Sequence, residues 1–116
     1  MSNFPEHYDN LLELMQKLGK GIPDVMSGFS ELHKAVSKDG ALDKKTKELI
    51  ALSIAITVRC NGCIAYHIHD ALKAGANREE IMETVGTAIL MGGGPSVVYG
   101  TEALEALEQF EEQGVS

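Results

Sequence analysis

Two cysteines and two histidines lie within ten positions of the stretch TVRCNGCIAYHIHDALKAG, residues 57–75. Cys60 and Cys63 are the two cysteines of the chain. Because they are three residues apart, a disulfide can join them across one turn of a helix. His67 follows Cys63 by four residues and therefore lies one turn further along the same face. Two thiols within disulfide reach and a nearby base are the parts needed to reduce a peroxide or to exchange a disulfide.

The expected position of Cys60 at the start of this helix bears on the chemistry of its thiol. Unpaired backbone amides and the helix dipole favour a thiolate there. A thiolate attacks the distal oxygen of a peroxide and becomes a sulfenic acid, and the second thiol condenses with it to form a disulfide. An outside thiol or dithiol reductant must then reopen that disulfide. Placement alone favours Cys60 as the more acidic of the two thiols.

A zinc site is a competing hypothesis for the same stretch, with Cys60, Cys63, His67 and His69 as its ligands. One helix does not favour this arrangement, since His69 lies about 200° around the axis from His67. The sequence has no second CxxC pair to complete the four ligands usual for structural zinc. A chance CxxC without chemical function is the remaining alternative. We expect a redox pair that uses neither a metal nor a cofactor.

Two carboxylates are candidate partners for the His67 ring. Asp70 follows it by three residues and could share its face, although a surface acid is the simpler interpretation. Glu48 lies where the polar KKTKE gives way to an apolar run, on the helix face shared with Leu52 and Ala55, so we expect it to be partly buried. A carboxylate in such a place needs a partner. An imidazole, a thiol and a lysine at the helix edge are all possible partners of the Glu48 carboxylate.

The positions of helix-breaking and helix-capping residues predict an all-α fold of about six helices. Glycine, proline and Asx residues separate segments of helical length, and no hairpin signal is present. The segments are residues 5–21, 23–39, 44–58, 60–75, 77–92 and 95–110. Asp43 is a candidate cap for the third, and Asn77 with Glu80 resembles a capping box at the start of the fifth. The Ile, Val and Thr content of residues 49–58 also allows a strand.

The run LIALSIAITV, residues 49–58, is apolar around its whole circumference as a helix. Such a helix is buried on all sides, within a domain or between subunits. It is too short to span a bilayer, which takes about 20 residues. A chain of this size covers such a helix poorly, and only 5% of its residues are aromatic. We therefore expect a homo-oligomer.

Length and charge limit the remaining possibilities. With 116 residues and 44% hydrophobic composition, we expect one domain over residues 1–116. The net charge of −7 argues against nucleic acid and against an anionic membrane as partners. The acidic, polar start MSNFPEHYDNLLELMQ is unlike a secretory signal. We expect the protein to be cytoplasmic. In the cytoplasm thiols stay reduced, and a cysteine pair is more often catalytic or metal-binding than structural.

The four candidate residues form the pattern E-x11-C-x2-C-x3-H, from Glu48 through Cys60 and Cys63 to His67. This pattern resembles the signature of the alkylhydroperoxidase D branch of the carboxymuconolactone decarboxylase family. The surrounding sequence ELIALSIAITVRCNGCIAYHIHDALKAGANREEIMETVGTAILMGGGPSVVYG is similar to the core of that family. The likeness extends over roughly residues 20–110.

The resemblance implies an all-helical fold, assembly into trimers or hexamers, and thiol-dependent peroxidase activity on a hydroperoxide. It implies that Cys63 attacks the peroxide and that Cys60 is its disulfide partner and a proton donor. His67 and Glu48 would then form the relay that moves protons to and from the thiols. A general disulfide oxidoreductase with the same residues, and a noncatalytic zinc-binding or scaffold oligomer, are the alternatives.

The chain also departs from the pattern. Dedicated alkylhydroperoxidases have a histidine between the cysteines, where this chain has Gly62, and this chain is a shorter, single-repeat version. The decarboxylase branch, which acts on a γ-lactone, generally lacks the CxxC pair, so the two cysteines argue against that chemistry.

Four further features lie outside this pattern. His69, outside the signature, is expected at an interface or a core edge, and Tyr66 is expected to pack near Cys63, where it could line a pocket. The glycine-rich MGGGPSVVYG, residues 91–100, lacks the GK[ST] ending and preceding strand of a phosphate loop, so we expect a tight turn between helices. Tyr99 in this segment could reach the active site.

Overall fold

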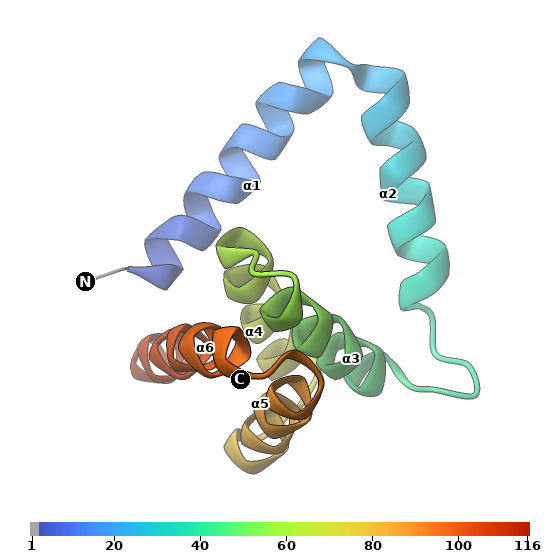
Figure 1. The fold of residues 1–116 in the computed structure, drawn as a ribbon. Helices are drawn as coiled ribbons and strands as arrows, with labels where there is room; N and C mark the ends of the chain where they lie inside the picture. Colours follow the sequence, from blue (N-terminus) through green and yellow to red (C-terminus); the bar gives the residue numbers. More distant parts are fainter. Residues whose placement is uncertain (1–2) are drawn as a thin grey trace.

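A computed structural model describes residues 3–116, and within them it has six α-helices and no strand (Figure 1). The predicted all-α fold is confirmed, and residues 49–58 are not a strand. The helices are α1 (Phe4–Gly21), α2 (Pro23–Ser37), α3 (Lys44–Thr57), α4 (Asn61–Lys73), α5 (Arg78–Gly92) and α6 (Gly94–Glu112). Helix α2 ends at Ser37, ahead of the stop expected at Gly40.

The starts of α3 and α5 follow the predicted capping chemistry. The Asp43 side chain accepts a hydrogen bond from the backbone N–H of Thr46 at 2.8 Å, which caps α3. Asn77 and Glu80 form both hydrogen bonds of a capping box at the start of α5. Gly93 connects α5 to α6 with a φ of +70°, a conformation that glycine adopts without steric cost. The predicted tight turn within residues 91–100 is therefore present.

The core lies among α3, α4, α5 and α6, which pack against one another (Figure 1). Its largest side chains are fully buried, and they come from all four helices and from the start of α1. They include Phe4, Leu52, Ile56, Ile64, Ile68, Ile81, Leu107 and Phe110. Helix α4 therefore has its inner face fixed by packing, and that packing sets the direction of its other side chains.

Helices α1 and α2 form an arm: α1 packs against α4 and α6 near its start, and its far end leads away from the bundle into α2 (Figure 1). The arm is anchored at its first residue, where the buried Phe4 donates its backbone N–H to Oε1 of Gln109 at 2.7 Å. Helix α2 packs mainly against α1 and has no buried residue. Its far end is tied to α3, because Nζ of Lys47 donates to the carbonyl oxygens of Val36 at 2.9 Å and Lys38 at 2.6 Å.

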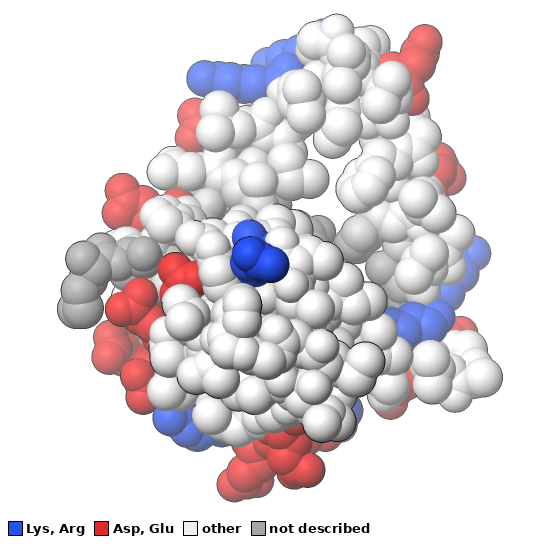
Figure 2. All heavy atoms as spheres, viewed as in Figure 1, with Lys and Arg blue, Asp and Glu red and all other residues white. Residues whose placement is uncertain are grey.

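One face of α3 is buried and the opposite face is not. Leu52 and Ile56 are fully buried, whereas Ile50, Ile54 and Val58 are 45–62% exposed. Figure 2 shows largely uncharged atoms where α3, α5 and α6 face the viewer, with acidic groups toward the edges. The expectation that this helix is covered all round is therefore not met within a single chain. No helix in residues 3–116 is both long enough and apolar enough to cross a bilayer.

Candidate active site

The turn between α3 and α4 places the two cysteines. The backbone N–H of Arg59 donates to the carbonyl of Ile56, and that of Cys60 donates to the carbonyl of Ala55, which is the paired pattern of a Schellman motif. Arg59 is left-handed, with a φ of +62°, at the position that usually holds glycine. Cys60 is thus both the residue that completes the end of α3 and the N-cap of α4.

Cys60 and Cys63 form a disulfide across the first turn of α4, with 5.2 Å between their Cα atoms. The backbone N–H of Cys63 also points at Sγ of Cys60, with 3.2 Å between nitrogen and sulfur. After reduction, this amide and the helix dipole would favour negative charge on the Cys60 sulfur. The first turn of α4 therefore holds the two cysteines within disulfide reach.

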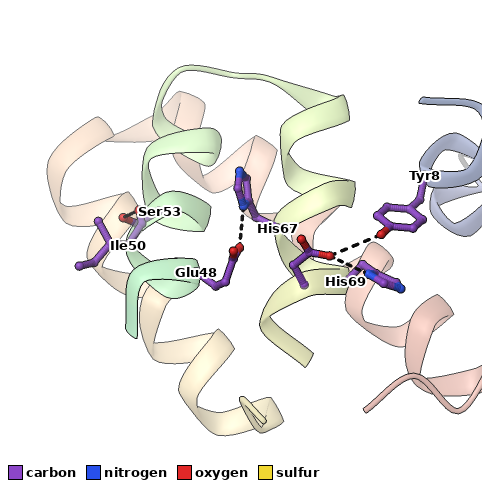
Figure 3. A network of polar contacts seen from close by, with 7 residues as sticks. Tyr8, Glu48, Ile50, Ser53, His67 and His69 are labelled. Atoms are coloured by element: carbon purple, nitrogen blue, oxygen red, sulfur yellow. Dashed lines mark hydrogen bonds and ion pairs between the residues drawn. The ribbon is translucent and has the colours of Figure 1, made fainter. Parts of the chain in front are cut away.

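Glu48 and His67 face each other between α3 and α4 (Figure 3). The distance from Nδ1 of His67 to Oε2 of Glu48 is 2.8 Å. Glu48 is 5% exposed, so it is more buried than expected, and its partner is the imidazole rather than a lysine. An ionised carboxylate only accepts hydrogen bonds, so the pairing places the ring proton on Nδ1 and leaves Nε2 free to exchange a proton.

A cavity of about 280 Å³ opens in front of the disulfide. Its walls come from α1, α2 and α4, so the arm closes a space that the bundle alone leaves open, and Figure 2 shows the hollow between the arm and the bundle. The lining residues are Leu11, Met15, Phe29, His33, Cys60, Gly62, Cys63, Tyr66 and His67. The wall is mostly apolar, and the groups able to transfer protons lie together along α4 and at His33.

Tyr66 lines this cavity, as its position beside the cysteine face predicted. Burial, and then the negative charge of Asp70, raise the pKa of Tyr66 above its usual value. Its hydroxyl is therefore a weaker acid than a solvent-exposed tyrosine, and it keeps its proton at neutral pH. Tyr66 is an amphipathic part of the wall.

His69 points to the opposite side of α4 from His67 (Figure 3). Its Nδ1 lies 2.9 Å from Oδ1 of Asp70, and its ring stacks on Tyr8 with 3.9 Å between centroids. The hydroxyl of Tyr8 donates to the same Asp70 oxygen at 3.4 Å. Asp70 thus contacts His69 and Tyr8 rather than His67, and it joins α1 to α4. His69 lies at the core edge, as expected.

The structure brings the four sequence-predicted site residues to one place and adds others. Cys60, Cys63 and His67 line one cavity, and Glu48 contacts His67 from behind. Tyr99 packs against the core and does not line the cavity. His33 was missed; its only signal is the i, i+4 spacing from Phe29. Within residues 3–116, no cluster of three or more histidine, cysteine or acidic side chains is arranged to hold a metal.

Comparison with known proteins gives one consistent family. The model of the carboxymuconolactone decarboxylase family matches residues 23–106. A crystal structure of a protein of this family from Legionella pneumophila is 50% identical, with a TM-score of 0.89, and the match covers 92% of this chain and 96% of that one. A family protein of Thermotoga maritima, for which a role in antioxidative response has been suggested, is 32% identical with a TM-score of 0.82, covering 96% and 97%.

A third relative is an alkyl hydroperoxide reductase AhpD from Nocardia farcinica. It is 30% identical over 89 residues, which are 77% of this chain and 48% of that protein. The present chain therefore corresponds to about half of that enzyme. Together with the family match and the Cys60–Cys63 pair, this places the chain in the carboxymuconolactone decarboxylase family, in its alkylhydroperoxidase D-like branch.

Proposed function

We propose that this protein is a thiol-dependent peroxidase that reduces organic hydroperoxides through the Cys60–Cys63 pair. One observation supports the proposal above the others. The disulfide, the His67 ring and a mostly apolar cavity lie together, while a buried Glu48 orients the ring from behind. A hydroperoxide in the cavity would meet the sulfurs and the base at once. The AhpD relative supports the same reaction class.

The first step is attack on the peroxide. His67 takes the proton of the Cys63 thiol through its free Nε2, and Glu48 stabilises the imidazolium that forms. The Cys63 thiolate attacks the distal oxygen of the hydroperoxide, so the S–O bond forms as the O–O bond breaks. Cys63 becomes a sulfenic acid, and the leaving alkoxide takes a proton to give an alcohol. Cys60 can donate that proton only while it is in its thiol form.

The second step closes the disulfide. The Cys60 thiolate attacks the sulfur of the Cys63 sulfenic acid, the S–S bond forms, and hydroxide leaves with the proton held by His67 as water. The dithiol is oxidised by two electrons, and the hydroperoxide is reduced to an alcohol and water. An outside thiol or dithiol returns the pair to the reduced state. No nucleic acid, membrane, metal or cofactor enters this scheme.

A single-turnover experiment tests the proposal. The protein is reduced, freed of reductant and mixed with one equivalent of cumene hydroperoxide, and free thiols are counted over time. We expect both thiols to disappear within the first minutes with formation of one equivalent of alcohol. If the thiols survive for hours with the hydroperoxide but react with a small disulfide, the protein is a general disulfide oxidoreductase and not a peroxidase.

The zinc alternative predicts a different result from the purified protein. Metal analysis of protein prepared without chelator should find far less than one zinc per chain if the cysteines are a redox pair. Stoichiometric zinc that blocks the thiols would favour a binding or scaffold role. The opposite orientations of His67 and His69 on α4 (Figure 3) support the redox assignment, because the two rings are not aimed at one ion.

We also propose that the chain assembles with copies of itself into a trimer or a hexamer. The support is the number of large apolar side chains left exposed on α3 and α5, such as Ile54 at 56%, Leu90 at 81% and Met91 at 75%. Patches of this kind on a folded chain usually mark an interface. The reducing cytoplasm, where a dithiol donor is available, is the compartment that fits the chemistry.

Sedimentation equilibrium tests the assembly. The wild-type protein should have three or six times the 12.5 kDa mass of one chain. Ile54→Asp combined with Met91→Asp should reduce the mass, because buried unpaired charges destabilise an apolar interface. Ala41→Asp, in the exposed connection before α3, adds the same kind of charge elsewhere and should leave the mass unchanged. A wild-type mass of 12.5 kDa would refute self-assembly.

A further inference from the structure

A second histidine lines the cavity in front of the disulfide, and it comes from a different helix than His67. His33 belongs to α2, one turn after Phe29, and both side chains line the cavity. The edge of its ring faces Tyr66, with 6.2 Å between centroids and 86° between planes. His33 therefore forms the wall on the side of the arm, whereas the cysteines and His67 form the wall on the side of α4.

A second hollow places His33 beside the proton relay as well. This smaller hollow, of about 100 Å³, is lined by His33, His67 and Glu48 together with residues of α2 and α3. The end of α2 is held there by the hydrogen bonds from Lys47 to the carbonyls of Val36 and Lys38. His33 is partly buried, so its ring has access both to the cavity and to solvent.

The peroxide reaction needs a proton that the relay does not supply. When the Cys63 thiolate breaks the O–O bond, the alkoxide that leaves is strongly basic and must be protonated as it departs. His67 has just accepted the Cys63 proton and needs it for the later release of water. The Cys60 sulfur accepts the backbone N–H of Cys63 at the helix N-terminus, an arrangement that favours thiolate and leaves less thiol to act as donor.

The other ionisable side chains of the cavity limit which group can donate this proton. Among the described residues that line the cavity, the ionisable side chains apart from the cysteines are His33, Tyr66 and His67. Burial and Asp70 raise the pKa of Tyr66, which makes it a poor donor at neutral pH. Gly62, between the cysteines, offers no side chain. Histidine is the residue type whose ordinary pKa suits proton donation near neutral pH.

We propose that His33 is a catalytic residue of the peroxidase reaction and protonates the alkoxide leaving group. The Cys63 thiolate attacks the distal oxygen, the O–O bond breaks, and the His33 imidazolium gives its proton to the alkoxide oxygen to form the alcohol. His33 regains a proton from solvent. The inference rests on the proposed function, because it assigns a role within that reaction. In this scheme His67 exchanges protons with the thiols, and His33 donates a proton to the substrate's leaving group.

The test compares two oxidants that differ in their leaving groups. Reduced protein is mixed in single turnover with tert-butyl hydroperoxide, whose leaving alkoxide needs a proton, or with 5,5′-dithiobis(2-nitrobenzoic acid), whose leaving thiolate does not. His33→Gln should lose about 10²-fold in rate with the hydroperoxide, the lower end of general acid catalysis, and keep its rate with the disulfide. Lys34→Gln, on an exposed neighbouring position of α2, should behave as wild type with both.

The outcomes separate the inference from the proposed function. A His33→Gln variant with wild-type rates for both oxidants would show that His33 is only a wall residue. An equal loss with both oxidants would show that it acts on the thiols or on the shape of the site. A wild-type protein that reacts with the disulfide but not with the hydroperoxide would overturn the proposed function and the inference together. Recovery of the hydroperoxide rate in His33→Ala by added imidazole would support the acid role.

Discussion

Helix α4 has two histidine–carboxylate pairs on opposite sides. Their nitrogen–oxygen distances are similar, but their exposure to solvent and their surroundings differ. Nδ1 of His67 lies 2.8 Å from Glu48, and Nδ1 of His69 lies 2.9 Å from Asp70. The Glu48 side chain is 7% exposed and that of Asp70 is 21% exposed. His67 of the first pair lines the cavity in front of the disulfide. In the second pair, the His69 ring stacks on Tyr8 near the start of α1.

We infer that a histidine–carboxylate pair is not sufficient for a reactive site, because His69 and Asp70 do not line the cavity in front of the disulfide. Glu48 comes from another helix, so it fixes the His67 ring relative to α3 and occupies its Nδ1, while the ring itself lines the cavity. Asp70 is the residue directly after His69, and its contacts with His69 and Tyr8 join α1 to α4. We therefore assign a chemical role to the first pair and a structural role to the second. Matched substitutions on the two sides test this assignment.

The largest difference is expected between the two histidines. His67→Gln should slow oxidation of the thiols by cumene hydroperoxide by about 10²-fold or more, because it removes the base that takes the Cys63 proton. His69→Gln should leave that rate within about twofold, since a change outside the reacting groups removes no acid or base from the reaction. Single-turnover thiol loss measures both. Equal losses in the two variants, with both still folded by circular dichroism, would contradict the division of roles.

A smaller difference is expected between the two carboxylates. Glu48→Gln keeps the shape of the side chain but removes the charge that stabilises the His67 imidazolium, so the hydroperoxide rate should fall by about tenfold, or about 1.4 kcal/mol of transition-state stabilisation. Asp70→Asn should not affect it. The same single-turnover assay compares the two variants. An Asp70→Asn loss as large as that of Glu48→Gln would show that the two pairs are coupled through α4.

On the structural side, the alkaline stability of the protein should depend on Tyr8. Burial, and then Asp70, raise the pKa of Tyr8 to about 12 from 10.0. Between these values the unfolded chain has lost a proton that the folded chain keeps, so the free energy of unfolding should fall as pH rises from 10 to 12. Tyr8→Phe should remove this part of the pH dependence. Urea unfolding at a series of alkaline pH values measures the slope.

The smallest effect is expected from the same variant at neutral pH. Tyr8→Phe keeps the stacking on His69 but loses the hydrogen bond to Asp70, which is long at 3.4 Å. The free energy of unfolding should decrease by about 0.5–1 kcal/mol, measured by urea denaturation at pH 7. The hydroperoxide rate should be unchanged. A rate that fell with Tyr8→Phe would place this cluster within the reaction.

Much of the fold and of the α4 site could be predicted because local rules determine them. Capping residues such as Asp43 and Asn77 mark helix starts regardless of the rest of the chain. The spacing from Cys60 to His67 fixes which side chains share a turn, once the helix is known. The burial of Glu48 followed from its position at the edge of an apolar run.

The arm could not be predicted in the same way. The apolar spacing of α2 predicts a helix with an apolar face, but Phe29 at 52% and Leu32 at 58% are exposed in the structure. Spacing says nothing about which surface a face meets, because that depends on tertiary packing. His33 reaches the cavity only through this packing, so its place opposite the cysteines appears in the structure and not in the sequence.

Trapping the sulfenic acid tests whether Cys63 is the thiol that attacks the peroxide. Reduced Cys60→Ser is treated with one equivalent of cumene hydroperoxide in the presence of dimedone, and the modified residue is located by mass spectrometry, with Cys63→Ser as the matched control. We expect a dimedone adduct on Cys63 in the first variant and none in the second. An adduct on Cys60 alone would exchange the roles of the two thiols, and no adduct in either variant would contradict the peroxidase account.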